Sequence, residues 1–247
     1  MIYVNGDSWS WHKDLYSADI WPNLLAQQLK TNCVNESIGC GSNSRILDNV
    51  TNLYISGLRP ALIVLALTVH HRYHLPSADM GSWSISPQTV RNDRLDVTDD
   101  YVKNWYYIHG HNEVDSIYRY YRDVWLLHEI CKKFKCPFFI FQIWDKSIQQ
   151  LGLLESTKNI KNFLNNNQID LSKQQGQAYL KSFLFFSKQQ HNWNYSEETV
   201  LTVLNNNDLA SDGHPNKKGH KKISDFVINE LIARDLISGG DDEQGWT

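Results

Sequence analysis

The chain has 247 residues, of which 24 are Lys or Arg, 27 are Asp or Glu, and 41% are hydrophobic. This length fits one large α/β domain, and the apolar content is sufficient for a sizeable core. The nearly balanced charge argues against a nucleic-acid-binding protein, which would usually carry a basic stripe.

The N-terminal residues, MIYVNGD, contain no basic region followed by an apolar stretch, so they do not look like a signal peptide. No run approaches the roughly 20 apolar residues that a membrane-spanning helix requires. The sequence therefore predicts a protein that is cytoplasmic as synthesised and has no membrane span. The high Asn content and the aromatic loops would also suit a component of a virus particle.

In the first third of the chain, short apolar runs alternate with helical periodicity. Residues 2–4 are an apolar strand, and residues 21–30 follow as a helix with Pro22 in its first turn. Residues 33–38 are a second strand, which ends at a Gly-rich turn before a helix that extends to about Tyr54. These four elements form two consecutive strand–helix units.

The clearest strand is the run 61–67, ALIVLAL, because it is continuously apolar like a parallel strand covered on both faces. Residues 76–113 look like an irregular insertion of the kind that forms lids or partner surfaces. The remaining predicted elements are an amphipathic helix at 117–135, a buried strand at 137–143 and a last helix at 217–235. Residues 150–205 contain helix-like pieces. A fifth strand could lie in this region, but the sequence pattern does not indicate where.

This alternation predicts an α/β fold: a three-layer α/β/α sandwich around a mostly parallel sheet of four or five strands, of the flavodoxin-like type. We expect a single domain over residues 1–236, with the insertion at about 76–113, and a mobile acidic tail at 237–247. Ligands in such folds bind beyond the carboxyl ends of the strands.

The first chemical motif is Gly6-Asp7-Ser8, directly after the first strand. A serine on a tight turn at a strand end exposes its hydroxyl and has backbone N–H groups beside it, as in a nucleophile elbow. Asp and Ser also favour ordinary capping turns. Taken alone, the motif therefore favours the purely structural interpretation.

The second motif is Asp212-Gly213-His214-Pro215-Asn216, before the last helix. A histidine with an aspartate two residues earlier can act as a general base with an orienting carboxylate. The alternative is a helix N-cap, in which Asp212 or Asn216 caps the helix and His214 has no chemical function.

Together the two motifs give the order Ser, Asp, His, and here the sequence resembles the SGNH, or GDSL-like, hydrolase family. That family carries a Gly-Asp-Ser block after its first strand and an Asp/His block before its final helix, and the run from Pro215 to His220 also resembles its pattern. The resemblance implies the SGNH hydrolase fold, Ser8 as nucleophile, His214 as base, and Gly41 as a backbone donor to the oxyanion. The Gly-rich block around Gly41 also fits a simple helix-initiating turn.

Two positions depart from the family pattern. The family has Asp three residues before its His, where this chain has Ser211, so Asp212 is the expected orienting acid and Asp208 the alternative. After the third strand the family has Gly-x-Asn-Asp, whose Asn donates to the oxyanion, whereas this chain has LTVHHR at 67–72. The candidate substitutes for this donor are Thr68, His70, Arg72 and Asn43.

No metal or other cofactor is expected. The four cysteines form no Cys-x-x-Cys pair and have no His at a zinc-ligand spacing. His70 and His74 would share a face of a helix, but Pro76 and the preceding strand assign this segment to a loop.

Two functions remain open. The first is a serine ester hydrolase that acts on small acyl esters through an acyl-enzyme; the resemblance suggests acetyl groups on carbohydrate or short lipid esters. Its partner would be a small-molecule or carbohydrate ester, with a stacking platform available at Trp83, Trp105, Tyr106 and Tyr107. The second is a weak or inactive SGNH-fold module with a carbohydrate-binding or structural role, which the two departures favour. The sequence does not fix the oligomeric state.

Overall fold

The computed structural model describes residues 1–11, 17–39, 41–75, 83–85, 112–143, 153–190 and 195–238. Most of the expected insertion at 76–113, including Trp105, Tyr106 and Tyr107, lies outside the described residues, as does most of the expected tail at 237–247. The predicted domain boundaries therefore stay predictions.

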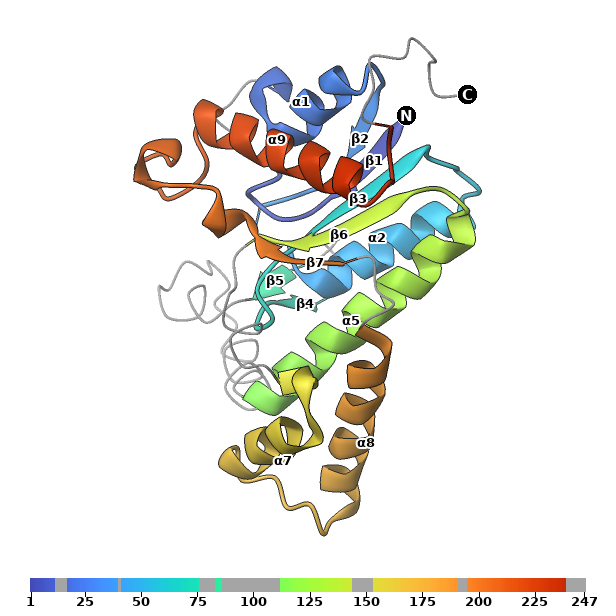
Figure 1. Cartoon of the computed structure of the whole chain (residues 1–247), viewed down its shortest axis with the longest axis vertical. Helices are drawn as coiled ribbons and strands as arrows, with labels where there is room; N and C mark the ends of the chain where they lie inside the picture. The colour runs from blue at the N-terminus through green and yellow to red at the C-terminus, as the bar shows by residue number, and fades with distance from the viewer. Residues whose placement is uncertain are drawn as a thin grey trace.

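A five-stranded sheet, in which all neighbouring strands are parallel, forms the centre of the molecule (Figure 1). Its strands are β1 (Ile2–Asn5), β2 (Cys33–Asn35), β3 (Leu62–Leu67), β6 (Phe138–Gln142) and β7 (Tyr195–Thr199). They lie in the order β2-β1-β3-β6-β7, which is the flavodoxin-like arrangement. The predicted α/β fold is confirmed, and β7 is the strand whose position the sequence did not fix.

Helices cover both faces of this sheet (Figure 1). On one face lie α1 (Trp21–Gln28) and α9 (Lys217–Ala233), and on the other lie α2 (Asn43–Ile55) and α5 (Glu113–Phe134). Two further helices, α7 (Thr157–Asn166) and α8 (Gln174–Gln189), pack beyond α5, and a small antiparallel pair is formed by β4 (Tyr73–Leu75) and β5 (Trp83–Ile85). None of the described helices combines the length and apolar character needed to cross a bilayer.

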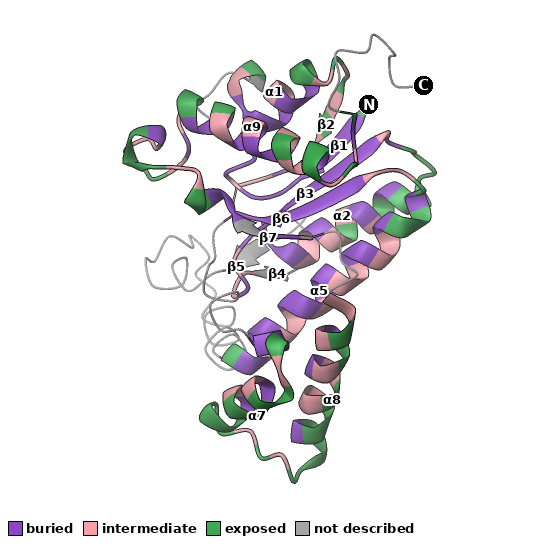
Figure 2. Cartoon of the chain, in the orientation of Figure 1, coloured by how far each residue is buried: buried purple, intermediate pink, exposed green. Residues whose placement is uncertain are grey.

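Strand β3 shows why the sheet needs two helical layers. All six of its residues are buried, and successive side chains of a strand point to opposite faces. The odd-numbered residues of β3 belong to the core beneath α2 and α5, and the even-numbered ones belong to the core beneath α1 and α9. Figure 2 shows the buried residues along the strands and on the inner faces of these helices.

Local hydrogen bonds explain where the observed elements differ from the predicted ones. Strand β2 ends at Asn35 rather than at residue 38, because the Asn35 side chain accepts a hydrogen bond from the Ser37 N–H and turns the chain. Helix α5 begins four residues earlier than expected, because the Asn112 side chain caps it by accepting from the Asp115 N–H.

Candidate functional site

The predicted residues lie on loops at the carboxyl edge of the sheet. Ser8 follows β1, Gly41 follows β2 and Thr68 follows β3. Since these strands are parallel neighbours, their carboxyl ends lie at one edge. The loop 205–216, which carries His214, lies at the same end of the molecule and leads into α9 (Figure 1).

Hydrogen bonds and close packing hold the turn that carries Ser8. The Ser10 N–H donates to the Asp7 carbonyl at 2.9 Å, and the Trp9 N–H donates to Asp7 Oδ1 at 2.9 Å. A Cβ added at Gly6 would lie 2.5 Å from Ser10 Oγ and 3.1 Å from the Ala66 carbonyl oxygen. A larger residue at position 6 would therefore be crowded, and the half-buried Ser8 is held on a turn packed directly against β3.

Asp7 is fully buried and joins this turn to the loop after β3. Its Oδ2 accepts a hydrogen bond from the Thr68 hydroxyl at 3.0 Å and forms an ion pair with Arg72 Nη1 at 2.9 Å. The same Nη1 lies 3.4 Å from the Gly41 carbonyl oxygen, to which it donates. Arg72 belongs to the loop that follows β3. Its guanidinium group therefore connects this loop to the loops that follow β1 and β2.

The candidate oxyanion donors come together, but several of them donate within the protein. The Asn43 side chain exchanges two hydrogen bonds with the Thr68 backbone: Oδ1 accepts from its N–H at 2.9 Å, and Nδ2 donates to its carbonyl at 3.0 Å. The Gly41 N–H donates to the Ile38 carbonyl at 3.2 Å. Arg72 differs from these groups, because a guanidinium has five N–H donors and the bonds described above use only Nη1.

His70, another candidate donor, contacts the start of α5. Its Nε2 lies 3.3 Å from Glu113 Oε1, and its ring packs edge-on against the His71 ring with the centroids 5.2 Å apart. Within the described residues, no group of three or more His, Cys, Asp or Glu side chains is arranged to hold a metal ion.

His214 lies in a tight loop that its own backbone closes. The Ala210 N–H donates to the His214 carbonyl at 2.7 Å, and Leu209 forms an antiparallel bridge with Pro215. Asp212 lies beside His214: its Oδ1 accepts from the His214 N–H at 3.0 Å, and its Oδ2 lies 3.2 Å from the imidazole Nδ1. Asp212 therefore contacts both the backbone and the ring of His214.

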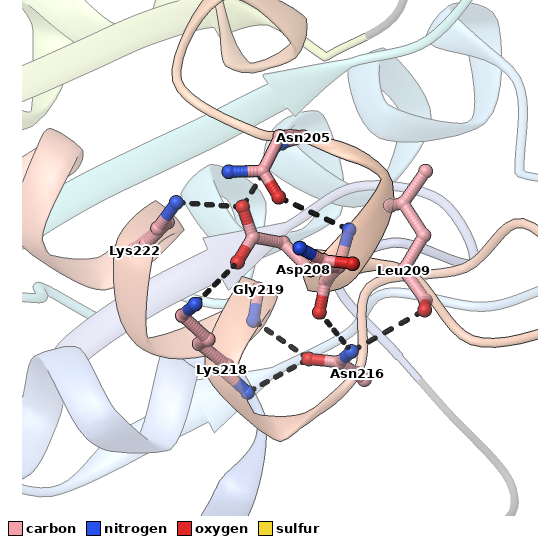
Figure 3. A network of polar contacts seen from close by, with 8 residues as sticks. Asn205, Asp208, Leu209, Asn216, Lys218, Gly219 and Lys222 are labelled. Atoms are coloured by element: carbon pink, nitrogen blue, oxygen red, sulfur yellow. Dashed lines mark hydrogen bonds and ion pairs between the residues drawn. The ribbon is translucent and has the colours of Figure 1, made fainter.

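The alternative acid, Asp208, forms an ion pair with the last helix, α9. It is fully buried, and its Oδ2 lies 2.6 Å from Lys222 Nζ (Figure 3). The hydrogen bond from Lys222 is the main cause that lowers the pKa of the Asp208 carboxyl group. Asn216 caps α9, because its Oδ1 accepts from the N–H groups of Lys218 and Gly219.

Sequence reasoning missed the role of the residues around Trp21. His220 is fully buried, and its Nδ1 accepts from the Trp21 backbone N–H at 3.3 Å, which connects α9 to the start of α1. The Trp21 indole N–H donates to Ser10 Oγ at 3.2 Å. The sequence signal was the presence of Trp21 and of the Ser10-Trp11 pair close to the Gly-Asp-Ser motif. The contact between Trp21 and His220 could not be predicted, because the two residues are 199 positions apart.

No protein-family model matches the chain, and no curated protein matches it. Among solved structures, 96% of the chain is similar to 98% of a psychrotrophic esterase from a Pseudoalteromonas species, at 14% identity and a TM-score of 0.50. Likewise, 96% of it is similar to 64% of an acetyl xylan esterase from the rumen bacterium Butyrivibrio proteoclasticus, at 11% identity and a TM-score of 0.50. A member of the lipolytic protein G-D-S-L family from Veillonella parvula is similar over 92% of this chain and 96% of its own, at 12% identity and a TM-score of 0.46. The predicted architecture is thus confirmed: the chain has the α/β fold of the SGNH, or GDSL-type, hydrolases.

Proposed function

We propose that the chain is a serine ester hydrolase of the SGNH type that acts on small acyl esters. The observation that carries this proposal is the contact between Asp212 and the His214 imidazole, in a loop at the sheet edge where the turn after β1 holds Ser8. An imidazole whose Nδ1 faces a carboxylate is oriented and can accept a proton at Nε2.

In the proposed mechanism, Ser8 Oγ attacks the acyl carbonyl carbon while His214 Nε2 takes the hydroxyl proton. Asp212 holds the ring in the required tautomer and stabilises the imidazolium. The tetrahedral intermediate collapses to an acyl-enzyme as His214 gives the proton to the leaving alcohol. Water then attacks the acyl-enzyme with His214 as base, which releases the acid and regenerates Ser8.

The oxyanion requires donors near Ser8, and we assign this role to the Ser8 N–H and the Arg72 guanidinium. Two observations support Arg72: its Nη1 binds Asp7, the neighbour of Ser8, and it also contacts the Gly41 carbonyl. A charged donor is a strong one, because charge-assisted hydrogen bonds are about twice as strong as neutral ones. The Gly41 N–H could contribute only after leaving the Ile38 carbonyl.

We propose acetyl groups on carbohydrate as the substrate class. Trp11, three residues after Ser8, is 42% exposed, and its ring lies against Gly39, where an added Cβ would be 3.4 Å from the indole. A flat, partly exposed apolar ring suits stacking against the apolar face of a sugar. The similarity to a protein named acetyl xylan esterase supports the same class.

Purified protein tests this proposal with p-nitrophenyl acetate and a fluorophosphonate probe. Wild type should hydrolyse the ester and take up one probe per chain, and Ser8→Ala should lose the label and about 10³-fold or more of kcat. Ser182→Ala, which changes a half-buried serine on α8, is the matched control and should behave as wild type. Absence of labelling in wild type, or labelling that persists in Ser8→Ala, would refute the proposed nucleophile.

The second candidate function is a binding module of the same fold with little turnover. The observation that favours it is that the Asn43 amide and the Gly41 N–H both donate within the protein. In that case the wild type would not label, but titration calorimetry with acetylated xylo-oligosaccharides would still detect binding, and Trp11→Ala would abolish it.

A further inference from the structure

A buried carboxylate lies at the base of the loop that carries His214. Asp208 has no exposed surface, yet two cations of α9 reach it: Lys222 Nζ lies 2.6 Å from Oδ2, and Lys218 Nζ lies 3.6 Å from Oδ1 (Figure 3). Oδ2 also accepts from the Asn205 N–H at 2.9 Å. Burying a carboxylate is costly unless it is paired and hydrogen-bonded. Oδ2 meets both conditions, whereas Oδ1 is paired with Lys218 but accepts no hydrogen bond from the described residues.

The backbone of Asp208 also contacts the start of α9. Its carbonyl accepts from the Asn216 N–H at 2.9 Å, and a Cβ on Gly219 would lie 2.2 Å from the same oxygen. The Asn216 side chain donates to the carbonyls of Asn207 and Leu209. As Figure 3 shows, both ends of the segment from Asp208 to Asn216 are therefore held at one point on α9.

His214 lies within the segment that this point closes. Between the two ends, the Leu209–Pro215 bridge and the hydrogen bond from the Ala210 N–H to the His214 carbonyl connect the two sides of the loop. The cations also occupy the first two turns of α9, where the helix dipole disfavours positive charge. The buried carboxylate offsets this cost for both lysines.

We propose that Asp208, paired with Lys222 and Lys218, is a positioning residue that sets the placement of the His214 imidazole relative to Ser8. Asp208 acts through the loop and does not contact the substrate. This inference rests on the proposed hydrolase function, in which a displacement of about 1 Å at the base can cost about 10²-fold in rate.

The test compares Asp208→Asn and Lys222→Met with Asp225→Asn. The control removes another carboxylate that pairs with a lysine of α9, Lys221, but an exposed one. Both test variants should lower kcat for p-nitrophenyl acetate by 10- to 100-fold with KM unchanged, and should slow fluorophosphonate labelling in parallel. Lys222→Arg, which keeps the charge, should restore most of kcat, and the control should behave as wild type.

A purely structural role would give a different pattern. It would lower the melting temperature of Asp208→Asn but leave kcat per folded, probe-titrated site at the wild-type value, and that result would overturn the inference. If Asp208→Asn does not fold, the value of kcat per probe-titrated site in Lys222→Met decides between the two roles. An inactive, unlabelled wild type would instead refute the proposed function, so the two failures are distinguishable.

Discussion

Replacing Arg72 by Met tests the contact that joins the three loops of the candidate site. Asp7 is fully buried and the Arg72 side chain is 13% exposed, so the variant leaves a buried carboxylate without its cation. Removing one partner of a buried ion pair costs about 3–5 kcal/mol. Asp7 keeps its hydrogen bonds from the Trp9 N–H and the Thr68 hydroxyl, which places the expected loss in unfolding free energy near ~3 kcal/mol, the lower end of that range.

Thermal and urea unfolding measure this loss. For a chain of this size, each kcal/mol corresponds to about 2–4 °C, so the melting temperature of Arg72→Met should fall by about 6–12 °C. Asp7→Asn, Arg72→Met and the double variant form a cycle, in which we expect a coupling energy of about 2 kcal/mol. If Arg72 also serves the oxyanion, kcat should fall about 10²–10³-fold.

The stabilising role of the ion pair and the oxyanion role of Arg72 can be refuted separately. Additive effects within about 0.5 kcal/mol would mean that the ion pair does not stabilise the turn. A folded Arg72→Met with the kcat of wild type would mean that the guanidinium is not an oxyanion donor, whatever its effect on stability. Arg72→Lys, which keeps a charge but lacks the planar fork, should lie between the two proteins in both assays.

Three further variants and one pH series follow from the same geometry. Gly6→Ala places a Cβ 2.5 Å from Ser10 Oγ and should lower the unfolding free energy by about 1–3 kcal/mol; a wild-type melting curve would contradict this. Asp212→Asn should lower kcat by up to about 10⁴-fold with little change in stability, and full activity would exclude Asp212 as the orienting acid. Trp11→Ala should raise KM for acetylated xylo-oligosaccharides but not for p-nitrophenyl acetate, and an equal effect on both would contradict a sugar platform. The pairing with lysine lowers the pKa of Asp208, so its contribution to stability is fully present above the ordinary aspartate pKa and is lost as pH falls through the lowered value. The difference in unfolding free energy between wild type and Asp208→Asn should therefore shrink only below about pH 4, and a difference that is independent of pH would argue against the ion pair.

The fold was predictable because its central strands are buried on both faces. The run 62–67 is apolar throughout, and no surface helix or loop among the described residues has a similar run. Strand β7 lacks this signal, since its sequence is YSEET. Among the described strands it pairs only with β6, at the edge of the sheet, and the pairing is irregular between Phe141 and Gln142. An edge strand needs no continuous apolar run, so neither period nor composition could locate it.

The sequence was sufficient to predict which loops form the candidate site, but not which contacts their residues make. Parallel topology is enough to bring the turn with Ser8 and the loop with Thr68 to one edge. It does not specify hydrogen-bond partners, which depend on loop conformation. Nothing in the pattern indicates that the Asn43 amide would bind the Thr68 backbone, or that Arg72 would reach a carboxylate 65 positions earlier.

The offset of the acid before His214 has a local structural cause. Gly213 lies between the acid and the histidine with φ at +82°, a conformation that favours glycine. The tight turn lets Asp212 bind the His214 N–H with one carboxylate oxygen and approach Nδ1 with the other. An acid two residues before the histidine can therefore reach the ring through this local turn, whose positive φ glycine adopts without strain. The absence of Asp at position 211 does not by itself argue against an oriented base.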